Sequence, residues 1–179
     1  STVNAAGFNN ALAFRVRTGT VDVDGTTTAR DFRLSSDAGA INVTGTVDVS
    51  GVTGGSIRMA AFQGLTLTGT LDASADTYNA AGKGGAIVLE TRGNGGKLDL
   101  ASGNIFLGVT ETASLGEFSG TLHLRAPQIA AGTDLAMQDV NSNIDGASSI
   151  IAEGYFVHDL TGGGGQITSF VQNDVMTNG

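Results

Sequence analysis

The chain has 179 residues, of which 28 are glycine, one is proline and none is cysteine. The single proline excludes a collagen-like repeat, and the lack of cysteine excludes disulfide bonds and thiolate metal sites. The formal net charge of −8 indicates a surface that repels nucleic acid and anionic lipid, so we expect neither as a partner. No stretch approaches the ~20 apolar residues of a membrane span, and we expect none.

A short motif recurs along the chain, and each copy predicts a β-strand. The copies, in chain order, are GTVDVD from position 19, GTVDVS from 45, GTLDAS from 69, GKLDLA from 96 and GTLHLR from 120. Their leading glycines recur at nearly equal intervals of about 25 residues, a period typical of solenoid repeats. Apolar and polar residues alternate within each copy, which is typical of a strand with one buried face.

Two further segments, SIRMAAF (56–62) and GAIVLE (85–90), predict strands between these copies. No segment has the sustained spacing of three and four residues that a helix needs, so the chain is predicted to be all-β. The segments 41–50 and 65–74 share identical residues at five matched positions, as expected when each coil stacks on its own copy. An interval of about 25 residues is too short for a propeller blade of ~40 or more.

We therefore predict a right-handed parallel β-helix, a solenoid of about seven coils with about 25 residues per coil. Residues 1–179 would form a single segment. Neither end of the sequence carries a helical or proline-rich cap, so we expect the segment to be part of a longer fibrous protein. Near the carboxy-terminal end, we expect Tyr155, Phe156 and Phe170 to pack over the last coils.

The alternation within the copies also predicts which side chains lie inside. One interior file is expected to contain Val21, Val47, Leu71, Leu98 and Leu122. In two copies the apolar face continues through a glycine, Gly45 or Gly69, and glycine within a strand pattern marks a bend or a close backbone approach. We place the corner between two sheets of a coil at these glycines.

The same alternation predicts an outward column of Asp22, Asp48, Asp72 and Asp99. Stacked carboxylates are suitable ligands for Ca²⁺, and paired carboxylates are used to cleave glycosidic bonds. A solvated outer face is the interpretation that we favour, because no basic residue joins the column before His123. The four aspartates are the only candidate binding residues, and we predict no catalytic residue, no metal site and no cofactor. His123 itself is expected to face solvent, and His158 lies in a similar strand-like context.

Five segments resemble a known family when taken in order. They are GTLDAS (69–74), GKGGAIVLETRGNGGKLDLASGNI (82–105), GTLHLRAPQ (120–128), GASSIIAEGYFVHDL (146–160) and VQNDVMTNG (171–179). Together they resemble the long exoproteins of the filamentous haemagglutinin type, over most of residues 39–179.

This resemblance implies two-partner secretion through an outer-membrane pore and display on the bacterial cell surface. The chain would then be a non-catalytic structural and adhesive segment of a fibre. Its partners would be neighbouring coils of the same fibre, together with host or cell-surface glycans or proteins. The alternative that the aspartate column leaves open is a carbohydrate-binding or polysaccharide-cleaving β-helix.

Overall fold

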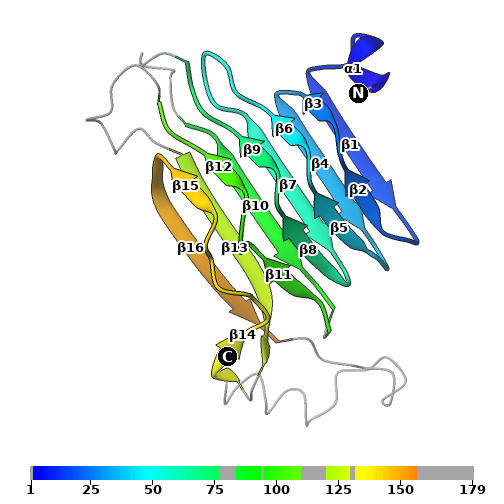
Figure 1. The fold of residues 1–179 in the computed structure, drawn as a ribbon, viewed down its shortest axis with the longest axis vertical. Helices are drawn as coiled ribbons and strands as arrows, with labels where there is room; N and C mark the ends of the chain where they lie inside the picture. The colour runs from blue at the N-terminus through cyan, green and yellow to red at the C-terminus, as the bar shows by residue number, and fades with distance from the viewer. Residues whose placement is uncertain (1, 77–83, 94, 110–119, 130–131, 157–179) are drawn as a thin grey trace.

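The computed structural model describes residues 2–76, 84–93, 95–109, 120–129 and 132–156 (Figure 1). These residues are mostly β-strand, with one short helix, α1 (Thr2–Ala5). The strands form three sheets whose neighbouring strands are parallel, apart from one short antiparallel pair. The prediction of an all-β fold built from parallel sheets is confirmed.

Each sheet collects strands that lie far apart in the sequence. The first sheet contains β1 (Ala11–Val16), β4 (Asp31–Ser36), β7 (Ser56–Ala61), β10 (Ala86–Thr91), β13 (Gly120–Ile129) and β16 (Ala147–Tyr155), with β14 (Asp134–Leu135) antiparallel to β13. The second contains β2 (Val21–Val23), β5 (Ala40–Val43), β8 (Gly64–Leu67) and β11 (Lys97–Asp99). The third contains β3 (Thr26–Thr28), β6 (Thr46–Asp48), β9 (Thr70–Asp72), β12 (Asn104–Phe106) and β15 (Asn143–Asp145).

The chain passes through the three sheets in a fixed order. From β1 it goes to β2 and β3, and then returns to the first sheet at β4, which pairs with β1. The rounds that begin at β4, β7 and β10 repeat this path, and each of their strands pairs with its counterpart from the round before. The round that begins at β13 differs, because β14 pairs back with β13 and the next described strand, β15, lies in the third sheet. The colours in Figure 1 therefore run in chain order along the stack.

The inward-facing side chains form apolar columns that continue from round to round. In the second sheet, Ile41, Leu65 and Leu98 are aligned partners, and all three are fully buried. The offset between the segments 41–50 and 65–74 is confirmed, because β5 aligns with β8, and β6 with β9, at this same offset. Burial of each such side chain contributes roughly 1.5–3 kcal/mol before conformational entropy is subtracted.

The predicted single interior file is wrong. Val21 and Leu98 lie in the second sheet, Val47 and Leu71 in the third, and Leu122 in the first. All five side chains face the interior, but the motif copies do not occupy equivalent positions in the stack. The reason is that the strands before and after a corner of the same round have similar sequences. The segment starting at Gly19 enters the second sheet, whereas the one starting at Gly45 enters the third.

The length of a round is also uneven, so the predicted constant spacing is wrong. In the second sheet the aligned partners are Val21, Ile41, Leu65 and Leu98, and each of these rounds is longer than the one before it. The extra length enters chiefly where the chain returns from the third sheet to the first. In successive rounds the third-sheet strand ends at residue 28, 48, 72 or 106, and the next first-sheet strand begins at residue 31, 56, 86 or 120, respectively.

The predicted corner at Gly45 and Gly69 is confirmed. Gly45 lies between β5 and β6, and Gly69 between β8 and β9. The backbones of successive rounds meet here, because the Thr70 amide donates to the Gly45 carbonyl at 2.9 Å and the Asn104 amide donates to the Gly69 carbonyl at 2.9 Å. A Cβ on Gly69 would lie 2.0 Å from the Gly45 oxygen, so this approach requires glycine.

One end of the stack carries a short helix that the sequence pattern did not predict. Figure 1 shows α1 beside β3 at the amino-terminal end. The Asn4 side chain donates from Nδ2 to the Thr28 carbonyl at 2.6 Å and accepts from the Thr28 amide at 3.0 Å. The side-chain amide of Asn4 thereby makes the two hydrogen bonds to Thr28 that the backbone of a neighbouring strand would otherwise make. So short a helix leaves no detectable periodicity.

Candidate functional site

The four candidate aspartates do not form one column. Asp22 and Asp99 lie in the second sheet, whereas Asp48 and Asp72 lie in the third. In the second sheet two neutral residues separate the carboxylates, because Asp22 aligns with Asn42, Asn42 with Thr66, and Thr66 with Asp99. The Asn42 side chain donates to Asp22 at 2.8 Å.

Asp48 and Asp72 are the only two of the four that are aligned neighbours. Oδ1 of Asp48 accepts from the backbone amide and the hydroxyl of Ser50, at 2.9 and 2.6 Å. Asp72 accepts the same pair of bonds from Ser74, at 2.9 and 2.6 Å. Each carboxylate therefore fixes the turn that follows its own strand, which is a common local role for aspartate.

The surroundings of this aspartate pair do not complete a metal site. Ca²⁺ takes six to eight oxygen ligands in proteins. Among the described residues, no group of three or more histidine, aspartate or glutamate side chains is placed to hold a metal ion. A role of the aspartates in binding sugars or Ca²⁺ stays a prediction from the sequence.

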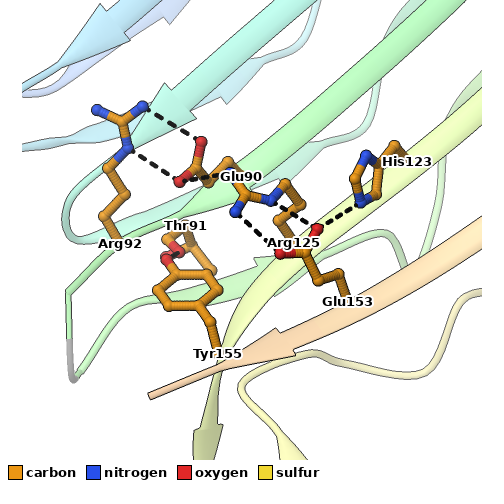
Figure 2. Close-up of polar contacts among 7 residues, drawn as sticks. All are labelled: Glu90, Thr91, Arg92, His123, Arg125, Glu153 and Tyr155. Carbon is orange, nitrogen blue, oxygen red and sulfur yellow. Dashed lines mark hydrogen bonds and ion pairs between the residues drawn. The ribbon is translucent and has the colours of Figure 1, made fainter. Parts of the chain in front are cut away.

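A second polar group lies on the outer face of the first sheet, over β10, β13 and β16 (Figure 2). We call it the Arg125 cluster and define it as Glu90, Arg92, His123, Arg125, Glu153 and Tyr155. These residues are brought together by register: Glu90 aligns with Arg125, and Arg125 with Glu153.

Arg125 is the centre of this cluster. It donates to both carboxylate oxygens of Glu153, from Nε and from a terminal nitrogen, each at 3.0 Å. Its other terminal nitrogen lies 3.3 Å from Glu90, which also pairs with Arg92 at 3.1 Å. The two-point contact between Arg125 and Glu153 is a strong, directional form of ion pair.

The electrostatics of the cluster follow from these contacts. The hydrogen bond from Arg125 lowers the pKa of Glu153 below its ordinary value, and the same bond raises the pKa of Arg125. Burial raises the pKa of Tyr155. Each of these shifts favours the protonation state that the observed contacts need.

Tyr155 and His123 complete the cluster on either side. The Tyr155 hydroxyl donates to the Thr91 carbonyl, and its ring lies 5.6 Å from the Arg125 guanidinium carbon, a cation–π contact. His123 lies on the outward face of β13, as predicted, but it is half-buried and its Nε2 lies 2.8 Å from Glu153. Tyr155 packs as expected, whereas Phe156 is exposed; Phe170 and His158 lie outside the described residues.

The cluster is best suited to hold strands together. The two glutamates and two arginines neutralise one another, and the donors of Arg125 and the hydroxyl of Tyr155 are engaged within the fold. It therefore links three successive strands of the first sheet. Sequence reasoning missed it because Glu90, Arg125 and Glu153 follow one another at unequal intervals along the chain.

The lowered pKa of Glu153 predicts how stability depends on pH. A carboxylate whose folded-state pKa lies below its ordinary value of 4.5 stabilises the fold above that pH, and the contribution is lost as pH falls through the folded-state pKa. Glu153→Gln is therefore expected to lower Tm by a few degrees at pH 7 and to match the unmodified chain at strongly acidic pH.

Thermal unfolding of both proteins across this pH range measures the effect. Asp145→Asn is the matched control, because Asp145 is exposed on β15 and forms no ion pair with another described residue. A Tm difference for Glu153→Gln that stays constant down to pH 2 would contradict the assigned role of the carboxylate.

Comparison of the chain with protein-family models, with curated proteins and with solved structures finds no match. Within the described residues, no helix is long and apolar enough to cross a membrane.

Proposed function

We propose that the chain is a non-catalytic structural and adhesive segment of a secreted bacterial cell-surface fibre, as its resemblance to filamentous haemagglutinin-type exoproteins implies. The full path would be a right-handed parallel β-helix of about seven coils. The observation that carries this proposal is the stacking of rounds, with a fully buried apolar column in each sheet. A stack of this kind lengthens by repetition of one unit, which suits a rod.

The aligned columns support a mechanical role. Leu71 lies between Val47 and Ile105 in the third sheet, and all three are fully buried. Each round thus receives hydrogen bonds and apolar contacts from the rounds on both sides, so the rod is expected to resist bending. Adhesion would come from many weak surface contacts along its length, which add through multivalency.

Electron microscopy of covalent tandems tests the structural part. Two or four copies of the chain joined in one polypeptide are expected to appear as rods whose length increases with copy number. Round particles, or lengths independent of copy number, would overturn the proposal. Adhesion is tested by glycan arrays, on which the chain should bind weakly alone and much more strongly when displayed on beads.

The aligned pair of Asp48 and Asp72 keeps the carbohydrate alternative testable. Under our proposal, Asp48→Ala with Asp72→Ala is expected to leave sugar-polymer binding unchanged and to lower Tm by several degrees, since four hydrogen bonds from Ser50 and Ser74 are lost. The control is the double asparagine variant, which keeps the Oδ1 acceptors and removes the charge. Cleavage of a polymer by the unmodified chain, or loss of binding in both folded variants, would favour the alternative.

A further inference from the structure

The amino-terminal end of the stack is only partly covered. The inward side chains of the first round, Phe14, Val21 and Val23, remain partly exposed, whereas Ile41 and Val43 one round further in are buried. A hollow of about 300 Å³ opens among the inward side chains of β1 and β2. In the part of the chain that the structure describes, α1 is hydrogen-bonded to β3, and no strand pairs with the outer edges of β1 and β2.

The opposite end has the complementary shape. There the first sheet extends one strand beyond the last complete round, because β16 pairs with β13. The structure describes no residue beyond 156. Among the residues that it does describe, no strand of the second or third sheet continues the round that β16 begins, and nothing pairs with the far edge of β16. Ile150 is 55% exposed although it aligns with the buried Leu122.

We propose that a second copy of this chain docks head to tail, with the far edge of β16 in one copy pairing with the free edge of β1 in the next. One layer at the junction would then be built from both copies. In this layer β16 of the first copy would occupy the first sheet, and α1 of the second copy would lie at the end of the third sheet. This inference goes beyond the proposed function, since it concerns separate chains and requires no adhesive role.

The side chains fit this contact in the register that the first sheet already uses. Continuing that register places Ile150 against Leu12, the small Ala152 against the bulky Phe14, and Glu153 against Arg15. Arg15 already pairs with Asp37, and Glu153 with Arg125, within each copy, so this contact would join two existing ion pairs into one network across the two ends. Since both ends are different surfaces of the same chain, the contact is heterologous and repeats without closing.

The backbone groups at the two edges also match. The carbonyls of Asn10 and Val16 accept from the amides of Asp31 and Asp37 in the next round. Alternation along β1 then directs the N–H and C=O groups of its outward residues, including Ala13, to the free edge.

In β13 the same alternation directs the inward residues to β16, because the Thr121 amide donates back to Gly85. The inward residues of β16, including Ala152, therefore present their backbone groups at the free edge. Donors and acceptors meet as they do between internal strands.

Proline at position 13 or position 152 is expected to block one end of the stack, since it removes an N–H at the free edge without removing an internal hydrogen bond. Ala13→Pro closes the amino-terminal edge and Ala152→Pro closes the carboxy-terminal edge. Ala13→Ser and Ala152→Ser are the matched controls, because they keep the N–H. Circular dichroism and Tm confirm that each variant is folded before assembly is measured.

Analytical ultracentrifugation of the full chain then tests the proposal. The unmodified chain and both serine variants should form species whose mass grows with concentration, and each proline variant alone should be a monomer. An equimolar mixture of the two proline variants should give a dimer and nothing larger, because only one pair of open ends remains.

Three results would overturn head-to-tail docking. They are a monomeric unmodified chain at millimolar concentration, a mixture of folded proline variants that stays monomeric, and a proline variant that assembles alone. The last result would indicate symmetric pairing of two like ends. A covalent tandem can still form rods in all three cases, so failure here is distinct from failure of the proposed function.

Discussion

Replacing Leu71 with alanine is expected to lower the free energy of unfolding by about 3 kcal/mol. Leu71 is fully buried at the middle of the stack, where its side chain lies between those of Val47 and Ile105 in the third sheet. The side chains above and below are fixed by their own strands, so they cannot move to fill the space. The loss therefore includes both the transfer term and the cavity term.

Urea denaturation measures this loss, provided that the slope of the transition is unchanged. Ile151→Ala is the control, since Ile151 faces outward on β16 and is 49% exposed; its cost is expected to stay below about 0.5 kcal/mol. Equal losses in the two variants would contradict the assignment of Leu71 to a continuous interior column.

Gly69→Val is expected to destabilise the fold by about 3 kcal/mol, the upper end of what overpacking costs. The cause is crowding between rounds rather than an unusual dihedral angle. A Cβ at this position would lie 2.0 Å from the carbonyl oxygen of Gly45, which also accepts a hydrogen bond from Thr70. The two rounds must separate locally to admit the side chain, and that hydrogen bond lengthens.

The first round offers a matched control for this substitution. Gly25 occupies the same corner as Gly45 and Gly69, but a Cβ there would meet no atom within 4 Å. Gly25→Val is therefore expected to change the free energy of unfolding by less than about 1 kcal/mol. If both variants unfold at the same urea concentration, close approach of successive rounds is not the reason for glycine at this corner.

Local pattern predicted the strands of the motif copies, the strands at 56–62 and 85–90, and the corner at Gly45 and Gly69, because alternation and glycine act within a few residues. Strands outside these segments, such as β4 and β16, were not predicted. The relation between rounds was harder to predict. The offset that joins Ile41 to Leu65 is correct, but the next round, from Leu65 to Leu98, is much longer than any motif spacing indicates. The strands before and after each corner are short and similar in composition. The sequence prediction therefore placed their inward residues in one column, although they belong to different sheets.

The same difficulty explains the outcome for the polar residues. Asp22 and Asp48 occupy like positions in similar motifs, yet they lie in different sheets, so the expected column is divided. The Arg125 cluster depends on alignment across three strands with unequal spacing, and its glutamates and arginines have no shared motif. Pairings of this kind become visible only when the register is known.

The uneven length of the rounds has a consequence for what such a protein can carry. Over the first four rounds, the return from the third sheet to the first takes up most of the variation, while the paired strands on both sides keep their alignment. Because the entropic cost of a connection grows only by about 0.6 kcal/mol per doubling of its length, new sequence can be inserted there at little thermodynamic cost. One edge of the molecule is thus free to diversify for recognition while the interior stays under constraint, which makes it the natural position for grafting a foreign epitope.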